Sequence, residues 1–467
     1  MGVLSEMADF PLRRTEPMSE ATSQVQVWNW AQNAPLGPRA RLQRPEDEDE
    51  LRRIILHRSG RIRPIGSTLS TGDLLAIQHQ QDTLIEISAL TGLIRSSETS
   101  ATFAAGTPLH EVYQTLKTMG RMLHASPGVI AIQTLAGAIA TGTHGQGLGQ
   151  GALADDVLHI RMLCADGTVA EFDRAHPWFG AVQLGLGCLG VITEITLRTV
   201  PLTVFTCFKS AVSADGLQEQ IYTWNNAFTF NKAWWFPEDD RVHVWCSRAA
   251  TAQEQQRYDA GDGDAVALSA GDSSLNATVD QTLAHMQNDT RILGQEGRHF
   301  ATVTRFKDFT DTTGDIYQLF CRGIAAPQIN VEIGIPLARA GKTIAQIKQW
   351  VAEAHPHMHY PIILRCTGPS SAWLSPAWQQ PTCFFGFVVY YADNGTLSSD
   401  GIAFLLEVEK RLAAQGGRPH WGKYYHPALY RWRELYSRWD DFRQVRAALD
   451  PTGAFSNAFT DRLLEGE

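Results

Sequence analysis

The chain has 467 residues, of which 44% are hydrophobic and 19% charged, and its formal net charge is −9. This length allows two or three globular domains, and the negative charge without any long Lys/Arg cluster argues against nucleic-acid binding. No apolar run reaches the roughly 18 residues that cross a bilayer. The 7 cysteines are scattered without a CxxC pair, so we expect a cytoplasmic protein without disulfides or a bound metal.

The first part of the chain mixes short strands with helices. Residues 1–24 lack the apolar core of a signal peptide and predict a flexible tail. Over 25–201, strand and helix patterns alternate with glycine-rich turns. The clearest elements are a strand at 61–65, an amphipathic helix at 108–119 closed by Gly120, a hairpin that turns at Asp166 and Gly167, and a strand at 190–200.

The second part carries longer strands. Segments rich in Trp and Phe, such as "KAWWFP" and "CFFGFVVYY", are separated by helices over 202–419, which predicts one larger antiparallel sheet. Residues at about 250–298 are rich in Gln, Asp, Gly and Ala and predict a polar surface insertion. Residues 420–467 end the chain in helices. The whole pattern indicates an α+β fold.

One motif needs care. "GLGCLG", Gly185 to Gly190, matches the GxGxxG fingerprint of a dinucleotide-binding loop. That fingerprint must follow a strand, open a helix and precede an acidic residue by about 20 positions. Here the motif leads into a strand, and Lys209 and Ser210 occupy the distant positions. The motif therefore predicts a turn before a strand rather than a Rossmann site.

Two loops have the composition of a site for an anion and a flat ring. "QTLAGAIATGTHGQG", Gln133 to Gly147, holds four glycines and three threonines, which let backbone amides approach a pyrophosphate. "RPIGSTLSTGD", Arg63 to Asp73, follows its strand with small hydroxylated residues that suit N–H groups around an anion. Leu69 is an apolar exception. The alternative interpretation of the first loop is a tightly packed structural segment with a buried His144.

Together these segments resemble the vanillyl-alcohol-oxidase-type (PCMH-type) flavoproteins, in the aldonolactone oxidase and alditol oxidase branch. The likeness also includes "VWNWAQN" (27–33), "LGCLGVITEITL" (186–197), "AWLSPA" (372–377), "RPHWGK" (418–423) and "DPTGAFSNAF" (450–459). It implies a two-subdomain FAD-binding domain at 25–201, a substrate-binding cap domain at 202–419, and C-terminal helices at 420–467 that return to the FAD domain.

The resemblance also implies which residues hold FAD. They are Gly66, Ser67, Thr68, Leu69, Ser70, Gly128, Thr134, Gly137, Ala138, Thr141, Thr143, His144, Gly145, Gly190, Ile192 and Asn457. In alditol and gulonolactone oxidases the loop that corresponds to Gly66–Ser70 reads G-S-G-H-S, and its histidine is the covalent tether to the flavin. Here Thr68 replaces the second glycine and Leu69 the histidine. We therefore expect non-covalent FAD, as in the plant galactonolactone dehydrogenases, which resemble this chain at the leucine.

Four side chains are candidates for the chemistry. Lys423, in "HWGK", matches the family lysine near the flavin and the substrate. Glu332 occupies the first position of a Glu-x-Arg pair found in some family members, but Gly334 replaces the arginine. Arg365 is the candidate substitute for that missing cation, and His420 lies three positions before Lys423. We expect Glu332, Arg365 and Lys423 to bind the substrate as well.

Two further positions bear on the substrate and the electron acceptor. Gly128 aligns with an alanine beside the flavin carbon that reacts with oxygen, and its missing side chain predicts O2 as acceptor and H2O2 as product. Val129 aligns with a substrate-contacting serine of alditol oxidase, which predicts a less polar or differently shaped substrate than a free alditol.

The resemblance thus implies an FAD-dependent oxidase that removes a hydride from a hydroxyl-bearing carbon. The expected substrate is a sugar, polyol, aldonolactone or sugar-like metabolite. One alternative is a dehydrogenase that uses a quinone or another acceptor, like galactonolactone dehydrogenase or the decaprenylphosphoryl-ribose oxidases. The other is a flavin-binding protein without turnover.

Overall fold

The computed structural model describes most of the chain. The described residues are 25–126, 128, 130–237, 240–261, 266–267, 310–320, 328–356, 358, 360–390 and 399–465. The predicted tail at 1–24 lies outside them, as does most of the predicted insertion, of which 250–261 and 266–267 are described.

Three sheets are built from the first part of the chain. They are a two-stranded sheet β1-β2, a parallel three-stranded sheet β3-β5-β4, and an antiparallel six-stranded sheet β10-β9-β11-β7-β6 with β8 on β11. The strands are β1 (Gln26–Trp28), β2 (Pro35–Pro38), β3 (Leu42–Gln43), β4 (Ile62–Ile65), β5 (Thr83–Glu86), β6 (Leu93–Ser96), β7 (Ser100–Ala104), β8 (Arg121–Leu123), β9 (Val157–Leu163), β10 (Val169–Asp173) and β11 (Val191–Pro201). The helices are α2 (Glu48–Leu56), α3 (Leu109–Thr118), α4 (Leu135–Ala140) and α5 (Phe179–Val182).

The local predictions in this part hold where the sequence signal was strongest. The predicted amphipathic helix is α3, which buries Leu109, Val112 and Leu116 at helical spacing. The predicted hairpin is β9-β10, and Gly167 in its turn has φ +77°. The "GLGCLG" motif leads directly into β11, so it does not have the strand-to-helix context of a Rossmann loop.

The second part of the chain forms one antiparallel nine-stranded sheet, called here the cap sheet, as the strand pattern predicted. Its order is β15-β16-β12-β14-β13-β18-β19-β17-β20. The strands are β12 (Phe205–Ser213), β13 (Phe230–Phe236), β14 (Arg241–Ala249), β15 (Val266–Ala267), β16 (Thr310–Gly314), β17 (Gln328–Pro336), β18 (Ile362–Thr367), β19 (Thr382–Tyr390) and β20 (Arg418–Pro419). The helices are α6 (Leu217–Ala227), α7 (Ala252–Asp259), α10 (Ile316–Phe320), α11 (Leu337–Ala354) and α12 (Ser399–Ala413).

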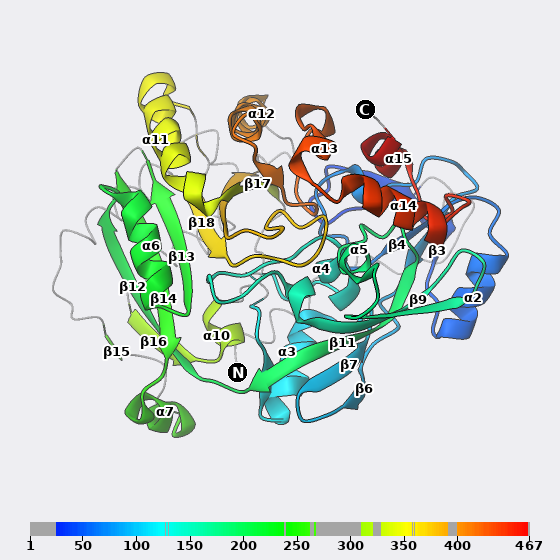
Figure 1. The fold of residues 1–467 in the computed structure, drawn as a ribbon, viewed down its shortest axis with the longest axis horizontal. Coiled ribbons are helices and arrows are strands. Elements are labelled where there is room, and N and C mark those ends of the chain that lie inside the picture. Colours follow the sequence, from blue (N-terminus) through cyan, green and yellow to red (C-terminus); the bar gives the residue numbers. More distant parts are fainter. Residues whose placement is uncertain are drawn as a thin grey trace.

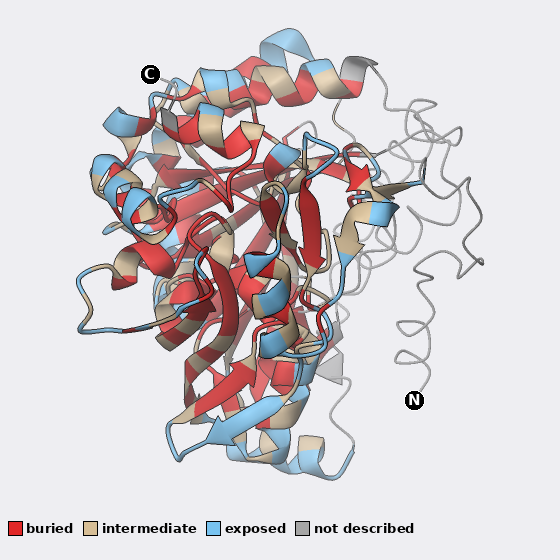
Figure 2. Cartoon of the chain, turned by 90° about the vertical axis from the view of Figure 1, so that its right-hand side faces the viewer, coloured by how far each residue is buried: buried red, intermediate tan, exposed pale blue. Residues whose placement is uncertain are grey.

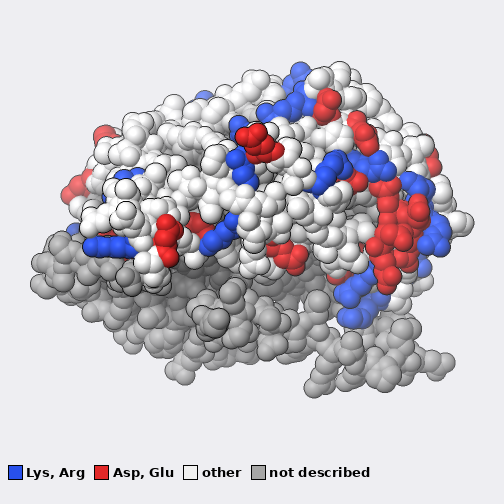
Figure 3. Space-filling view, turned by 90° about the horizontal axis from the view of Figure 1, so that it is seen from below, with Lys and Arg blue, Asp and Glu red and all other residues white. Residues whose placement is uncertain are grey.

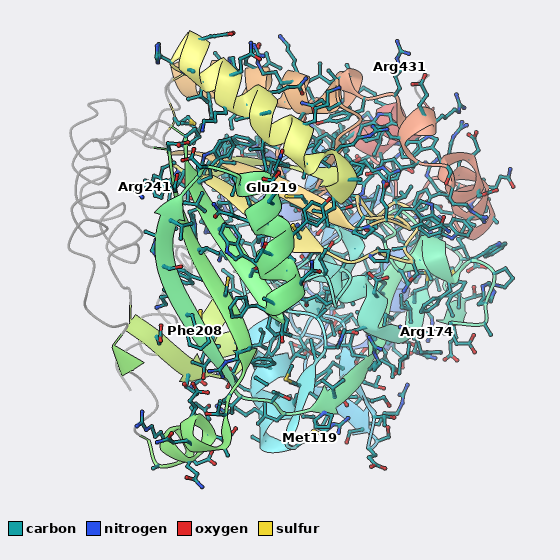
Figure 4. The ribbon with its side chains drawn as sticks, turned by 60° about the vertical axis from the view of Figure 1, so that its left-hand side comes forward. Met119, Arg174, Phe208, Glu219, Arg241 and Arg431 are labelled. Atoms are coloured by element: carbon teal, nitrogen blue, oxygen red, sulfur yellow. The ribbon has the colours of Figure 1, made fainter. Side chains whose placement is uncertain are left out.

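The two faces of the cap sheet have different neighbours. Helices α6, α11 and α12 cover the outer face, and Figure 4 shows α6, which carries Glu219, and α11 lying across it. Helix α11 buries Ala340, Ile344, Ile347 and Val351, which lie three or four residues apart on one side. Side chains alternate between the two faces along each strand of the cap sheet. One set therefore packs under the helices, and the other set points toward the first part of the chain. Figure 2 shows the buried residues concentrated along the strands inside the molecule.

The C-terminal helices lie against the small parallel sheet of the first part of the chain. Helices α13 (Trp432–Leu435), α14 (Trp439–Leu449) and α15 (Ala458–Glu465) close the fold, and in Figure 1 α14 and α15 (red) lie near β3 and β4 (blue). The Asn457 amide donates to the carbonyls of Leu74 at 3.0 Å and Ala76 at 2.8 Å, which fixes this arrangement.

Charged side chains are mixed on the face that Figure 3 shows. Over the described part of the lower face, Figure 3 shows Lys and Arg interspersed with Asp and Glu rather than gathered in one broad basic field. Among the described residues, every helix is too short or too polar to span a bilayer.

Candidate active site

A cavity lies between the loops of the first part of the chain and the inner face of the cap sheet. On the first side it is lined by residues 66–70 and by Thr134, Gly137, Thr141, Thr143 and His144. On the other side it is lined by strands β13, β14, β17, β18 and β19 and by residues of the segment 420–423. The two quoted loops therefore face the cap across one space.

Strand register explains how Glu332 and Arg365 meet. Glu332 on β17 pairs with Gly386 on β19, and Gly386 pairs with Ile363 on β18. Two residues along, Gly334 pairs with Phe384, and Phe384 pairs with Arg365. Arg365 thus stands in the same row as Gly334, two strands away and on the same face. The arginine that some relatives carry on the glutamate strand is replaced by one that approaches from β18.

Gly334 has no room for the missing arginine. A Cβ atom there would lie 2.9 Å from Thr382 Cγ2 and 3.1 Å from Phe384 Cε1. The Phe384 ring stacks on His144 with 3.6 Å between the ring centres, so it is held in place. The space beside Glu332 on its own strand is therefore filled by an aromatic ring.

The C-terminal segment brings in the other two candidates. Strand β20 pairs with the edge of β17, and the segment continues along that edge, with His420 N donating to Glu332 O at 2.9 Å and Tyr424 N to Asn330 O at 2.9 Å. This pairing places His420 and Lys423 beside Glu332. Thr71 N donates to Gly422 O at 3.2 Å, which joins the same segment to the loop of the first part.

These side chains form a buried charged cluster. An Arg365 Nη2–H donates to Glu332 Oε1, and His144 Nε2 lies 3.5 Å from the same oxygen. Glu332 is 4% exposed, His144 3% and His420 6%. Burial alone would raise the pKa of Glu332, but Arg365, together with the two histidines, lowers it well below the usual 4.5. Glu332 is therefore a carboxylate throughout the ordinary pH range.

The histidines are held neutral. Burial lowers the pKa of His144 below 6.5 and that of His420 well below 6.5, against the attraction of Glu332. His144 Nδ1 lies 3.1 Å from Gly145 O and Nε2 lies 3.5 Å from Glu332 Oε1, so both ring nitrogens face acceptors and the neutral ring can donate to only one of them. His420 Nδ1 accepts from Gly422 N at 3.0 Å, so its proton is on Nε2. Burial also lowers the pKa of Lys423 from 10.5.

The loop 66–70 is packed closely enough to present its backbone to a ligand. A Cβ atom on Gly66 would lie 2.0 Å from Thr134 Oγ1, so only glycine allows the two loops to meet. Ser67 Oγ donates to Ile132 O at 2.5 Å, and Thr68 O accepts from Trp30 N at 2.9 Å. Thr68, at the position of the second glycine in relatives, has φ +53°. It therefore keeps a glycine-like backbone despite its side chain.

The residues present fit a large polar cofactor such as FAD. Four cavity-lining groups have a buried polar atom without a hydrogen-bond partner, namely Arg63 Nε, His144 Nε2, Asn330 Oδ1 and Arg365 Nε. The loop 66–70 and the threonine-rich segment supply backbone amides and hydroxyls on one side. Leu69 lines the cavity as the apolar member of its loop.

Some predicted cofactor residues lie elsewhere among the described residues. Gly128, Ala138, Gly145, Gly190, Ile192 and Asn457 are not part of the cavity lining. Asn457 instead ties the chain end to the backbone after Leu69, as described above. Gly128, with φ +73°, packs against the cluster, because a Cβ there would lie 2.7 Å from Arg365 Nη1 and 2.8 Å from His144 O. Val129 lies outside the described residues. Their contacts with cofactor or substrate stay predictions.

Other lining residues were missed by sequence reasoning. They are mainly Arg63, Leu186, Gly187, Lys232, Trp234, Trp245 and Asn330. Arg63 donates to Leu186 O and Gly187 O, and burial lowers the pKa of Arg63 to about 10. The "GLGCLG" turn therefore does reach the cavity, although it is not a Rossmann loop. Its glycines were a usable signal, and so was the basic residue in the strand before Gly66.

One group could bind a metal by residue type. Ligand atoms of His144, Glu332 and His420 lie within 4.8 Å of one another. The Arg365 guanidinium already contacts Glu332, which opposes a second cation there. The expectation of a metal-free protein stays a prediction.

Comparison with known proteins places the chain in a family. Residues 195–463 match the model "D-arabinono-1,4-lactone oxidase", and residues 40–173 match the model "FAD binding domain". The chain is 25% identical to the L-gulonolactone oxidase of Mus musculus over 94% of this chain and 98% of that protein. It is 26% identical to the L-gulono-1,4-lactone dehydrogenase of Mycobacterium tuberculosis over 94% and 99%, respectively.

The fold itself recurs in a cholesterol oxidase from Brevibacterium sterolicum. The TM-score is 0.72 at 15% identity, covering 94% of this chain and 96% of the other. At this identity the likeness concerns the fold alone. Because the first family model spans more than half of the sequence, the chain belongs to the D-arabinono-1,4-lactone oxidase family and carries an FAD-binding domain ahead of its cap sheet.

Proposed function

We propose that the protein is an FAD-dependent oxidase that removes a hydride from a hydroxyl-bearing carbon of a sugar, polyol, aldonolactone or sugar-like metabolite. The observation that carries the proposal is the cluster of buried Glu332, His144 and His420 with half-buried Arg365 and Lys423, at the junction of the cap sheet and the cofactor loops. The names of the relatives, which include a lactone oxidase and a lactone dehydrogenase, support the substrate class.

Proton removal falls to Glu332 and His144. With the His144 proton on Nδ1, the carboxylate oxygen and Nε2, which lie 3.5 Å apart, together hold one proton from the substrate hydroxyl. Arg365 keeps Glu332 ionised and orients it. A carboxylate with such a low pKa is a weak base alone, and the adjacent imidazole nitrogen makes the pair a better acceptor.

Positive charge and hydrogen-bond donors stabilise the reacting oxygen. The Lys423 ammonium and the His420 Nε2–H both come from the segment pinned to the edge of β17. Negative charge that develops on the substrate oxygen is stabilised by donors already fixed in a site shielded from water. When bound in the cavity, FAD supplies a two-electron acceptor for the hydride.

We infer that FAD is held without a covalent bond. Leu69 offers no nucleophile, and its side chain supplies apolar contact worth about 1–2 kcal/mol when fully buried. Backbone amides of residues 66–70 and the hydroxyls of Thr134, Thr141 and Thr143 would hold the polar parts of the cofactor. Acid precipitation of the yellow protein should release FAD into the supernatant. Colour that remains in the pellet would show a covalent link and contradict this assignment.

Two residues favour different electron acceptors. Gly128 favours O2, whereas Leu69 favours the dehydrogenase alternative with a quinone or similar acceptor. Enzyme reduced by substrate and then mixed with aerated buffer should reoxidise quickly and release H2O2. Slow reoxidation alongside fast turnover with a quinone would establish the dehydrogenase instead.

We also propose the division into a tail (1–24), an FAD domain (25–201), a cap domain (202–419) and a returning C-terminal segment (420–467). Sheet membership supports it, since the nine-stranded sheet takes its strands from Phe205 to Pro419. A cytoplasmic location and small-molecule partners, without nucleic acid, complete the proposal. Described cysteines are free and buried, as a reducing compartment requires.

A further inference from the structure

The cavity is cationic in a protein whose formal net charge is −9. Among its described lining residues there are four Lys or Arg side chains and a single carboxylate: Arg63, Lys232, Arg365, Lys423 and Glu332. Arg365 is paired with Glu332, Lys423 serves the reacting oxygen in the proposed function, and Arg63 donates to backbone carbonyls. Lys232 has no part in that chemistry.

Lys232 belongs to a row of alternating cations and indoles on the inner face of the cap sheet. Register pairs Lys209 on β12 with Trp245 on β14, and Trp245 with Lys232 on β13. Lys232 Nζ lies 4.9 Å from the ring centre of Trp234, and Lys209 Nζ lies 4.7 Å from that of Trp245. The two indole rings are 4.6 Å apart and meet edge to face.

This row is buried yet part of the cavity wall. Lys232 is 3% exposed, Trp234 6% and Trp245 3%, and all three line the cavity. Lys209 is also 3% exposed but is not among the lining residues. A hydrogen bond from a buried ammonium to an anion is strong because little water competes for either group. Indole faces pack against the C–H faces of sugar rings.

The row lies at a distance from Glu332, although Lys232 stands one strand away from Arg365. Trp234 pairs with Ile363, Ile363 with Gly386, and Gly386 with Glu332. Three strand spacings separate the ends of this series, or about 14 Å between backbones. A substrate that touches both must extend well beyond the carbon that is oxidised.

We propose that Lys232, Trp234 and Trp245 form a subsite for an anionic group at the far end of a sugar-like substrate. The proposal rests on the proposed function for the position of the reacting end. The anionic group is a carboxylate or a phosphate, both of which accept charge-assisted hydrogen bonds from an ammonium. The indoles bind the ring or carbon chain between the anionic group and the reacting hydroxyl.

The test measures binding to the FAD-loaded enzyme without oxygen, using probe pairs matched in carbon skeleton. Lactobionate against lactitol tests a carboxylate, and glucitol 6-phosphate against glucitol tests a phosphate. We expect at least one charged probe to bind about 10-fold to 100-fold more tightly than its neutral partner. Lys232→Met should abolish that preference, Lys232→Arg should retain part of it, and the matched control Lys209→Met should leave it intact.

Three results would overturn the subsite. These are equal affinities for charged and neutral probes, absence of binding by every charged probe, and equal loss of preference in Lys232→Met and Lys209→Met. A melting curve for each variant separates a binding loss from unfolding, and Lys232→Arg provides a folded variant with the charge kept. Since calorimetric binding needs no turnover, lack of oxidation of these probes would count against the proposed function and not against the subsite.

Discussion

The two walls of the cavity differ in the chemical groups that line them. The wall formed by the first part of the chain consists of glycines, threonines and backbone amides around residues 66–70 and 134–143. The cap wall presents long charged and aromatic side chains, such as Glu332, Arg365, Lys232 and Trp234, from neighbouring strands of one sheet. Holding a cofactor of fixed shape suits the first wall, and recognising and reacting with a variable substrate suits the second.

The difference also shows how each wall tolerates change. A close backbone contact such as Gly66 against Thr134 admits no other residue, whereas a charge on the sheet can be supplied from another strand of the same face. Arg365 does this in place of the arginine that Gly334 replaces on the strand of Glu332. Substitutions on the cap wall should therefore alter turnover and leave FAD binding intact, and substitutions on the loop wall should do the reverse.

The largest effect is expected for Lys423→Met on the cap side. The variant keeps the length of the side chain and removes its charge, so substrate oxidation should slow by about 10²-fold or more. FAD content, read from the absorbance ratio of the purified protein, should stay the same. A variant with the full anaerobic rate would reduce Lys423 to a packing residue and leave Glu332 and His144 as the main chemical groups.

Arg365→Met should slow substrate oxidation by about 10-fold to 100-fold and move its pH dependence. Arg365 lowers the folded-state pKa of Glu332, so the contribution of Glu332 to stability is present above its unfolded pKa and is lost as the pH falls through the folded one. Without the guanidinium the folded pKa rises. Activity that needs the carboxylate should then fall off on the acidic side at a higher pH than in the parent enzyme.

The control for this prediction is Arg365→Lys, which keeps a charge but not the planar fork, and should retain part of the acidic activity. Adding Gly334→Arg to Arg365→Met should not rescue it, because Thr382 and Phe384 fill that space. An unchanged pH profile in Arg365→Met would show that the pKa of Glu332 does not depend on its pairing with Arg365.

Gly128→Ala should lower substrate oxidation by about 10-fold, as well as any reaction with O2. The new Cβ would stand 2.7 Å from Arg365 Nη1, so the guanidinium must shift away from its place beside Glu332. Stopped-flow measurement of each half-reaction separates the two effects. In an Arg365→Met background the same substitution should cost the oxidation step less, because only the close approach to His144 O and the positive φ remain, and a fully additive loss would contradict the contact with Arg365.

Thr68→Gly should have the smallest effect, and it tests the loop wall. Glycine relieves the strain of the left-handed backbone at position 68, and its greater freedom in the unfolded chain offsets part of that relief. The free energy of unfolding should rise by about 1 kcal/mol. The melting temperature should rise by about 1–3 °C with turnover unchanged. Gln379, with φ +54°, is exposed and outside the cavity lining, so Gln379→Gly is the matched control and should raise the melting temperature by a similar amount.

Local signals in the sequence predicted the fold class, the large antiparallel sheet and the loops that line the cavity. Glycine spacing and strand periodicity are short-range properties, and they were sufficient for α3, β9-β10 and β11. The meeting of Glu332 with Arg365 depends on the order β17, β19, β18 in the sheet, which no local pattern specifies. Lys232 and Trp234 were missed for the same reason, since a lysine among tryptophans on a strand has no signature of a cavity wall.

The pairing of the 418–424 segment with the edge of β17 has a consequence for biosynthesis. His420 and Lys423 reach Glu332 only after α12 has been made and the chain has returned to the sheet. A ribosome-bound chain that stops before this segment can form most of the cap sheet, but it lacks both donors. The enzyme should therefore acquire its chemistry late in synthesis, once the 418–424 segment has paired with β17.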